Sequence, residues 1–310
     1  MKKLSYFLIV LSAVCWGTIG IFTRTVTEAG FSALEMLFVK VVMGACFLSA
    51  WFMIKDKSLF KLKTPKDILY FIGTGICSFV FFSWCYIQSI NLTSIGIAVV
   101  FLYTAPVFVM IMSVFLFHEK MTLRKVVVLL LTFSGCVLVT GLLESVGGTI
   151  TLLGVMLGLG SGFGYALYSI FGTFALKRGY RSLTITYYTF LTAAIFMLFL
   201  LNPIDIAQRI SDTHLWLYMV VFTAVTTVIP YVAYTTGLAY IEAGKASVMA
   251  TIEPVVAVGI GILFFQESAS IMKLLGIVMV LSSVFLLRDK KTEDLPKDDM
   301  DNSDKVASTE

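Results

Sequence analysis

The chain has 310 residues, of which 58 % are apolar and 14 % charged, and it carries a formal net charge of +4. Its mean hydropathy of +0.93 excludes an ordinary soluble globular protein, in which about 25 % of residues are charged. The composition indicates a protein that lies mostly within a lipid bilayer.

Ten apolar runs follow one another along the chain, and short polar segments separate them. A helix that crosses the hydrocarbon core needs about 20 mostly apolar residues. Runs this long and continuous favour helices over the short alternating strands of a membrane β-barrel. We therefore predict an all-α integral membrane protein with ten transmembrane helices, at about residues 5–23, 33–53, 68–89, 96–117, 124–141, 151–174, 183–201, 215–237, 246–264 and 271–287.

Residues 289–310 differ from the rest of the chain, since they are rich in Lys, Asp and Glu and have no apolar period. A segment of this composition cannot bury enough apolar surface to offset the entropy lost on folding. We expect a disordered, charged tail there.

Lysine and arginine gather on one side of the predicted spans. With a cytoplasmic N-terminus, 19 of them fall in cytoplasmic segments, only Arg24, Arg209 and Lys273 fall outside, and Lys40 lies within a span. Cytoplasmic loops carry the excess of Lys and Arg in membrane proteins. We therefore predict a multi-pass protein of the cell membrane with cytoplasmic N- and C-termini. The positive net charge then belongs to the cytoplasmic loops, and no nucleic-acid partner is indicated.

One stretch of sequence occurs twice. Residues 86–119 align with residues 234–267 at a constant offset of 148 without a gap, and eight of the 34 positions are identical. Biased composition alone would give about two or three identities, so internal duplication is the better interpretation. The identical pairs are Tyr86/Tyr234, Gly96/Gly244, Ala98/Ala246, Val100/Val248, Pro106/Pro254, Val107/Val255, Phe117/Phe265 and Glu119/Glu267.

The number of spans in each half predicts how the two copies are related. Five spans precede the middle of the chain and five follow it, and an odd number makes the second half enter the membrane from the opposite side. We therefore predict two inverted five-helix repeats, at residues 1–143 and 149–288.

The repeated unit is a tyrosine-bearing helix, a short turn, Gly-x-Ala, a proline within a helix and a glutamate 13 residues after the proline. Together with Trp16-Gly17 in the first run, this pattern resembles the drug/metabolite transporter superfamily, specifically its EamA-type members with two repeats. The resemblance covers about residues 1–288. It implies a transporter of small organic solutes, such as amino acids or related metabolites, with a cavity lined by the third, fourth, sixth, eighth and ninth helices.

The chain departs from the family pattern at one charged position and between its own repeats. EamA-type proteins commonly carry an arginine in the second helix, where this chain has Lys40, and lysine lacks the planar fork that holds a carboxylate at two points. In the first repeat Ala105 stands at the position that Glu253 occupies in the second.

Glu253 and Lys40 are the charged candidates for function. Glu253 is the only carboxylate deep within a predicted span, where an ionisable group is costly and by default a functional candidate. It would couple transport to protons or contact the solute, or it would be a structural group hydrogen-bonded to backbone freed by Pro254. Lys40 would meet a solute carboxylate, pair with Glu253, or extend toward the membrane interface.

Pro106 and Pro254 interrupt equivalent spans, which indicates either helix breaks around a central site or simple packing kinks. Glu119 and Glu267 follow at the ends of these spans. We expect them to be structural residues that accept hydrogen bonds from the start of the following helix.

Several aromatic residues within the spans are further candidates, since together they suit a cavity for an amphipathic solute. Individually such residues more often pack or anchor at interfaces. The candidates are Tyr103, Trp84, Tyr165, Tyr168, Tyr231 and Tyr234.

The sequence predicts neither a cofactor nor a metal site. All five cysteines lie within predicted spans without C-x-x-C spacing, and the phosphate-binding loop of ATP-driven pumps is missing. An enzyme should show paired carboxylates or a His/Asp cluster near one membrane face, and the spans carry neither.

We therefore predict a secondary transporter, with export as the leading direction, that works by alternating access. A passive channel, or an integral membrane enzyme or scaffold without transport, is the alternative. Its predicted partners are the lipid bilayer and a small solute. Protons are the candidate coupling ion, although exchange or uniport without them fits the sequence equally. The sequence leaves the oligomeric state open.

Overall fold

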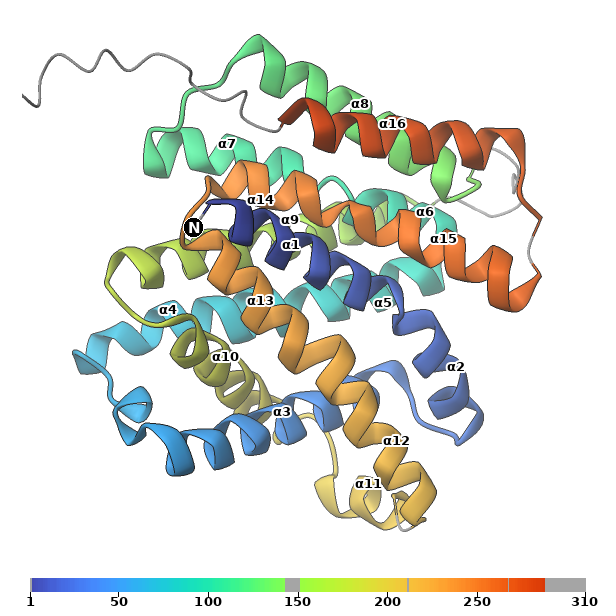
Figure 1. Ribbon diagram of the computed structural model, residues 1–310. Helices are drawn as coiled ribbons and strands as arrows, with labels where there is room; N and C mark the ends of the chain where they lie inside the picture. Colours follow the sequence, from blue (N-terminus) through green and yellow to red (C-terminus); the bar gives the residue numbers. More distant parts are fainter. Residues whose placement is uncertain (1, 143–150, 211, 267, 288–310) are drawn as a thin grey trace, which may run out of the picture.

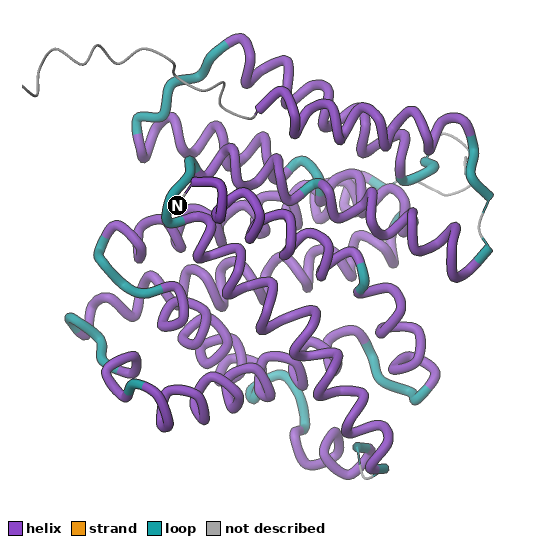
Figure 2. Tube along the Cα trace, viewed as in Figure 1, coloured by secondary structure: helices purple, strands orange, loops and turns teal. Residues whose placement is uncertain are grey.

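The computed structural model describes residues 2–142, 151–210, 212–266 and 268–287. Every regular element in these residues is a helix, and the described part of the chain contains no β-strand (Figure 2). The prediction of an all-α protein is therefore confirmed. The predicted tail, the predicted boundary between the repeats at residues 143–149, and Glu267 lie outside the described residues.

Five of the ten predicted spans are built from two or more consecutive helices, because the chain changes its helical geometry within them (Figure 1). In chain order the elements are α1 (Lys2–Gly17), α2 (Ile19–Glu28), α3 (Ala33–Lys55), the short 3₁₀ turns η1 (Lys57–Phe60) and η2 (Pro65–Asp67), α4 (Ile68–Ile72), the π-helix η3 (Gly73–Val80), α5 (Phe81–Leu92), α6 (Ile95–Leu102), α7 (Ala105–Phe117), α8 (Leu123–Val139), α9 (Leu152–Lys177), α10 (Ser182–Met197), α11 (Pro203–Arg209), α12 (Thr213–Thr223), the π-helix η4 (Ala224–Val228), α13 (Ile229–Leu238), α14 (Ala243–Ala250), α15 (Ile252–Phe265) and α16 (Ile271–Leu287).

Seven helical stretches among the described residues are long and apolar enough to cross a membrane. They correspond to seven of the ten predicted spans. The other three predicted spans fall on α8, α10 and α16, which have 16 or 17 residues each. The seven stretches are Lys3–Glu28, Ala33–Lys55, Pro65–Leu92, Ile95–Phe117, Leu152–Lys177, Thr213–Leu238 and Ala243–Phe265.

The breaks within the helices recur at the offset of the sequence repeat. α6 begins at Ile95 and α14 begins at Ala243, 148 residues later. α7 ends at Phe117 and α15 ends at Phe265, again 148 residues apart. The duplicated sequence is thus also a duplicated piece of structure, with a helix broken at the same place in both copies.

Two further local features obey the same offset. The π-helices η3 and η4 end at Val80 and Val228, which are equivalent positions. His118 and Gln266 follow the ends of α7 and α15 with left-handed backbones, at φ of 55° and 54°, a conformation that commonly ends an α-helix.

The helix α8 packs closely on α16, whose bounds lie 148 residues after those of α8 (Figure 1). Thr132 Oγ1 donates a hydrogen bond of 2.8 Å to Ser283 Oγ. One turn further along α8, Gly135 lies against Val280, which is one turn earlier in α16. Residue numbers therefore rise along α8 as they fall along α16, and the two helices are antiparallel.

The glycine-rich helix α9 lies at the centre of the packing. It contacts both α5 and the broken helix formed by α6 and α7. A Cβ atom at Gly162 would lie 2.3 Å from Thr104 Oγ1 and 2.6 Å from the Phe101 carbonyl oxygen. The small residues thus allow the backbones to approach closely, and they do so within one chain.

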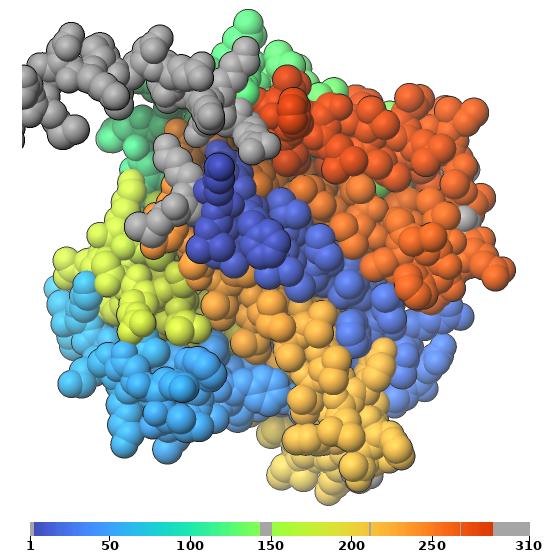
Figure 3. Space-filling view, in the orientation of Figure 1, coloured from blue at the N-terminus to red at the C-terminus, as the bar shows by residue number. Residues whose placement is uncertain are grey.

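The N-terminal helix α1 packs on α13, α14 and α15. The space-filling view shows this contact from outside, with the blue N-terminal segment against the orange segment that holds these helices (Figure 3). Two buried side chains of α1, Ile9 and Trp16, belong to the large central core that also includes residues of α9, α10 and α13.

A charged cluster joins α8 to the start of α14. Lys125 Nζ lies 2.9 Å from Glu242 Oε2 and 3.6 Å from Glu119 Oε2. The Ala243 N–H donates a 3.2 Å hydrogen bond to Glu119 Oε1. The expectation that Glu119 accepts from the following helix is therefore wrong. The start of α8 is already capped by Thr122, which accepts a hydrogen bond from the Lys125 N–H. Glu119 instead accepts a hydrogen bond from the first N–H of α14, in the other copy.

Replacement of Gly276 by alanine should destabilise the protein. The new Cβ would lie 2.6 Å from the Val139 backbone nitrogen and 2.7 Å from the Gly135 carbonyl oxygen, and backbone atoms cannot move aside as a side chain can. We expect a loss of about 1–3 kcal/mol from overpacking, seen as a lower thermal unfolding midpoint of the purified protein.

The matched control is Gly259→Ala in α15, where a Cβ would meet no atom within 4 Å. This variant should retain or raise the midpoint, because alanine is the better helix former. Equal midpoints for the two variants would contradict the close α8–α16 contact.

Replacement of Lys125 by methionine should destabilise the protein in a pH-dependent way. Burial raises the pKa of the Glu119 carboxyl group, and the Lys125 ammonium opposes this rise. Without Lys125 the folded-state pKa of Glu119 rises further above its unfolded value, so stability present at low pH is lost as the pH increases through the folded-state pKa. We expect a loss of up to about 3 kcal/mol at neutral pH, measured as unfolding midpoints between pH 5 and pH 8.

The double variant Lys125→Met/Glu119→Gln is the control, because it removes the charge that Lys125 neutralises. Its midpoint should recover part of the loss and depend less on pH. A pH-independent loss that the double variant does not relieve would show that Lys125 acts through packing alone.

Candidate functional site

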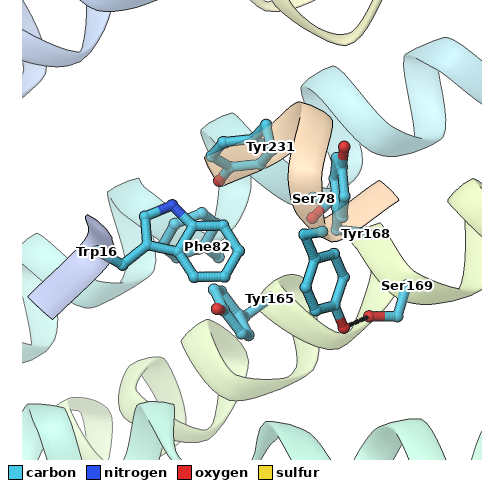
Figure 4. A pocket seen from close by; sticks show the side chains of 8 residues that line it. Trp16, Ser78, Phe82, Tyr165, Tyr168, Ser169 and Tyr231 are labelled. Carbon is cyan, nitrogen blue, oxygen red and sulfur yellow. Dashed lines mark hydrogen bonds between the residues drawn. The ribbon is translucent and has the colours of Figure 1, made fainter. Parts of the chain in front are cut away.

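A small cavity lies among α1, η3, α5, α9 and α13. Its volume is about 10 Å³, room for about one water molecule. Aromatic rings and hydroxyl groups form its wall, and none of its lining residues is charged (Figure 4). The lining residues are Trp16, Ser78, Phe82, Tyr165, Tyr168, Ser169, Tyr231 and Tyr234.

The aromatic rings of this wall contact one another. The ring of Trp16 lies 5.3 Å from that of Tyr231, 5.6 Å from that of Tyr234 and 6.3 Å from that of Tyr165, between centroids. Tyr168 meets Tyr231 edge-on at 5.0 Å. Trp16 therefore connects the N-terminal helix α1 with α9 and α13, and it is only 6 % exposed.

Two of the four tyrosine hydroxyl groups are hydrogen-bonded within the wall. Tyr168 Oη pairs with Thr235 Oγ1 at 2.6 Å, and Tyr234 Oη pairs with Ser169 Oγ at 2.7 Å, the bond drawn in Figure 4. Neither Tyr165 nor Tyr231 forms a hydroxyl hydrogen bond with another described residue.

The two π-helices lie next to this region. Ser78 lies within η3, and Tyr231 is the third residue of α13, the helix that follows η4 directly. Single turns of π-helix are rare and are frequently found at functional sites. The π-helix η3 contacts α10, because the hydroxyl groups of Thr74 and Thr189 form a hydrogen bond of 2.6 Å.

Glu253 lies beside the cavity at the start of α15. Its backbone oxygen faces Gly17, the residue after Trp16, so closely that a Cβ at Gly17 would be 2.9 Å away. The side chain is half-buried, and it has no ion-pair or hydrogen-bond partner among the described residues. Its carboxyl group lies within electrostatic range of Tyr86, Tyr103, Tyr165, Tyr231 and Cys136.

Lys40 lies elsewhere. Its Nζ atom is 4.7 Å from the centre of the Phe222 ring, a cation–π contact with α12. The ion pairs of the described residues include neither Lys40 nor Glu253, so the pair considered from the sequence does not form in this structure.

The prolines lie just after the helix breaks. Pro106 is in the first turn of α7 and Pro254 in the first turn of α15. A first-turn N–H has no partner within its own helix, so proline costs nothing there. The interruptions themselves fall at residues 103–104 and at Thr251, and Thr104 and Thr251 each donate a side-chain hydrogen bond of 2.6 Å to a carbonyl oxygen three residues earlier.

Four of the six aromatic candidates meet at the cavity, and two do not. Tyr165, Tyr168, Tyr231 and Tyr234 line it. Tyr103 packs instead on the cluster of α8 and α16 around Cys136 and Val280. Trp84 is 45 % exposed, because α5 turns the face that carries Phe82 and Cys85 toward α9 and leaves Trp84 on the outer side.

Three residues that line the cavity were not predicted as site residues from the sequence, namely Trp16, Ser78 and Phe82. Trp16 entered only as part of the family pattern, although it is the residue that joins α1 to the cavity. Its neighbour Gly17 was the available signal, since a small residue beside a tryptophan in mid-span permits a close helix contact.

The described residues contain no group of three or more His, Cys, Asp or Glu side chains that could hold a metal ion. What the arrangement offers is an apolar, hydroxyl-bearing cavity beside one carboxyl group, which suits binding of a small organic molecule.

Comparisons with known proteins agree with this arrangement. The family model described as "EamA-like transporter family" matches residues 3–141 and 152–288, one match in each half of the chain. A solved crystal structure superposes with a TM-score of 0.75 over 92 % of this chain and 96 % of that one, at 16 % identity, which shows the fold alone.

Similar proteins of known sequence are also described as transporters. An uncharacterized transporter of Archaeoglobus fulgidus is 28 % identical over 90 % of this chain and 94 % of its own length. The uncharacterized transporter YxxF of Bacillus subtilis is 25 % identical over 92 % and 89 %. The uncharacterized inner membrane transporter YhbE of Escherichia coli K12 is 28 % identical over 85 % and 80 %.

The two family matches cover most of the chain, one in each half. Each match contains one of the two recurring helix breaks. The chain therefore belongs to the EamA-like transporter family and is a multi-pass membrane transporter of the drug/metabolite type.

Proposed function

We propose that this chain is a secondary transporter that exports small organic solutes, such as amino acids or related metabolites, by alternating access. The observation that carries the proposal is the pair of broken helices, α6–α7 and α14–α15, which recur at one offset. An aromatic cavity lies among the neighbouring helices, and Glu253 in α15 has no ion-pair or hydrogen-bond partner among the described residues. Helices broken near the bilayer midplane in both halves are typical of transporter binding sites.

In this proposal the halves are inverted repeats at residues 1–143 and 149–288, with ten helices in all. The antiparallel packing of α8 on α16, equivalent helices of the two halves, supports this. The broken helices also run in opposite directions: in Figure 1 the chain passes leftward from α6 to α7 but rightward from α14 to α15.

Two of the ion pairs that join the halves lie at opposite ends of the predicted spans and support an alternating mechanism. Lys125 of the first half pairs with Glu242 of the second, and Arg209 of the second half pairs with Glu35 of the first. With cytoplasmic termini, the first pair lies at the inner membrane face and the second at the outer face. Opening the cavity to one side would separate one pair while the other holds the halves together.

The cavity must enlarge to accept a solute. About 10 Å³ accommodates a water molecule and no organic compound. Movement of α1 relative to α9 and α13 would separate Trp16 from Tyr165, Tyr231 and Tyr234 and open the space between them. Burial of apolar area between these rings stabilises the closed arrangement when the site holds no solute.

Glu253 is the candidate for coupling solute movement to protons. A carboxylate within a membrane protein is stabilised either by a bound proton or by a cationic partner, and the described residues provide no such partner. A proton gradient could therefore drive exchange at this residue.

Proteoliposomes that contain the purified protein test the proposal. Vesicles loaded with a panel of amino acids and related metabolites should show saturable counterflow of at least one labelled solute. Large conductance without saturation would contradict a carrier and support a channel. The Glu253→Gln variant should keep solute exchange but lose its dependence on an imposed pH gradient.

Glu119→Gln is the matched control, because it also replaces a half-buried carboxyl group but lies at the Lys125 cluster, away from the cavity. Its transport should still respond to the pH gradient. An unchanged pH response in Glu253→Gln would remove the coupling role of Glu253 and leave transport itself intact.

A further inference from the structure

The cavity wall consists mainly of the faces and edges of aromatic rings, with a few hydroxyl groups and no charged side chain. Trp16, Tyr165 and Tyr231 surround the space (Figure 4), with Trp16–Tyr231 and Trp16–Tyr165 centroid distances of 5.3 and 6.3 Å. Aromatic faces carry negative electrostatic potential and attract cations, most strongly where water is excluded. Trp16 and Tyr231 are 6 % and 7 % exposed, so this wall is shielded from solvent.

The charge beside the wall is negative. Glu253 lies within electrostatic range of Tyr165 and Tyr231, and its backbone contacts the residue after Trp16. Lys40, in α3, does not line the cavity and instead lies over the ring of Phe222.

The tyrosine hydroxyl groups without a partner among the described residues also favour a cationic ligand. Tyr168 and Tyr234 already pair with Thr235 and Ser169, whereas Tyr165 and Tyr231 form no hydroxyl hydrogen bond with the described residues. A phenol oxygen can accept a hydrogen bond from an ammonium group. An ammonium group placed here would therefore meet two acceptors and three aromatic rings, and the Glu253 carboxyl group would attract it from outside the cavity wall.

We propose that the transported solute carries a protonated amino group, and that this group binds between Trp16, Tyr165 and Tyr231 beside Glu253. The inference rests on the proposed transport function and specifies its substrate class. An organic anion of the same shape would be rejected, because its carboxylate would face Glu253 with no cation to compensate it. An amino acid would be recognised through its amino end.

Binding to the purified protein in detergent tests the inference without transport. Phenethylamine, phenylalanine and 3-phenylpropionate share one apolar body and carry a cation, a zwitterion and an anion. Their stabilisation of the protein against thermal unfolding, measured against concentration, gives an apparent affinity for each. We expect phenethylamine to bind at least about tenfold more tightly than 3-phenylpropionate, with phenylalanine between them or equal to the amine. Equal or tighter binding of 3-phenylpropionate, or no stabilisation by phenethylamine, would overturn the inference.

Variants assign the preference to the named groups. Glu253→Gln should bring the affinities for the amine and the acid to within about threefold of each other, since it removes the charge that distinguishes them. Tyr231→Phe should retain the preference for the amine, because the ring persists, and Tyr231→Leu should weaken it. Trp84→Leu is the control for loss of an aromatic residue, because Trp84 is exposed and outside the cavity, and it should bind all three probes as the unchanged protein does. A preference that survives in both Glu253→Gln and Tyr231→Leu would place the recognition elsewhere.

The two proposals fail in different ways. Saturable counterflow of some solute together with tight binding of the acid would contradict the ammonium inference and leave transport standing. Preferential binding of the amine without counterflow of any solute would contradict transport and leave the binding site standing.

Discussion

Backbone groups within a hydrocarbon layer must find their hydrogen-bond partners inside the protein, because lipid offers none. This constraint allows an interrupted helix at membrane depth only where other parts of the chain surround it. In the present fold both breaks meet this condition. Thr104 and Thr251 return hydrogen bonds to nearby carbonyl oxygens, and the glycine-rich helix α9 closes against the first break at Gly162. The first break therefore lies against α9, which also lines the cavity, and Thr251 at the second break is buried.

The same arrangement explains why the two halves share a backbone but not a site. The breaks, the π-helices and the left-handed residues His118 and Gln266 repeat at one offset, whereas the chemistry does not. Ala105 takes the place of Glu253 in the first copy. A symmetric carboxylate would put two like charges near one cavity, which raises the cost of ionising either of them. In the proposed mechanism, the single carboxylate of Glu253 would leave one position at which a proton or a cationic solute is exchanged.

Much of the fold follows from the sequence, because the bilayer imposes length and apolar composition on each span. The long apolar runs of the sequence predict the helical class and the positions of most spans. The sequence repeat at an offset of 148 residues predicts the duplicated breaks. The helix rotations are not visible in this way. Trp84 and Trp16 look alike as mid-span tryptophans, but packing of α5 on α9 leaves the first exposed, and close contact of α1 with α15 places the second in the cavity wall. Likewise Glu119 reaches the first amide of α14 only because the other copy folds back against it, a long-range contact that local pattern cannot specify.

The central claim is that two copies of one unit cross the membrane in opposite senses around the cavity. Single cysteines at Asn91 and Ala239, both exposed and next to the start of the broken helix in their own copy, test it most directly in a chain freed of its five native cysteines. A membrane-impermeant thiol reagent applied to intact cells should label Asn91→Cys and spare Ala239→Cys until the cells are opened. Labelling of both from the same side would contradict the inverted arrangement and the alternating mechanism built on it.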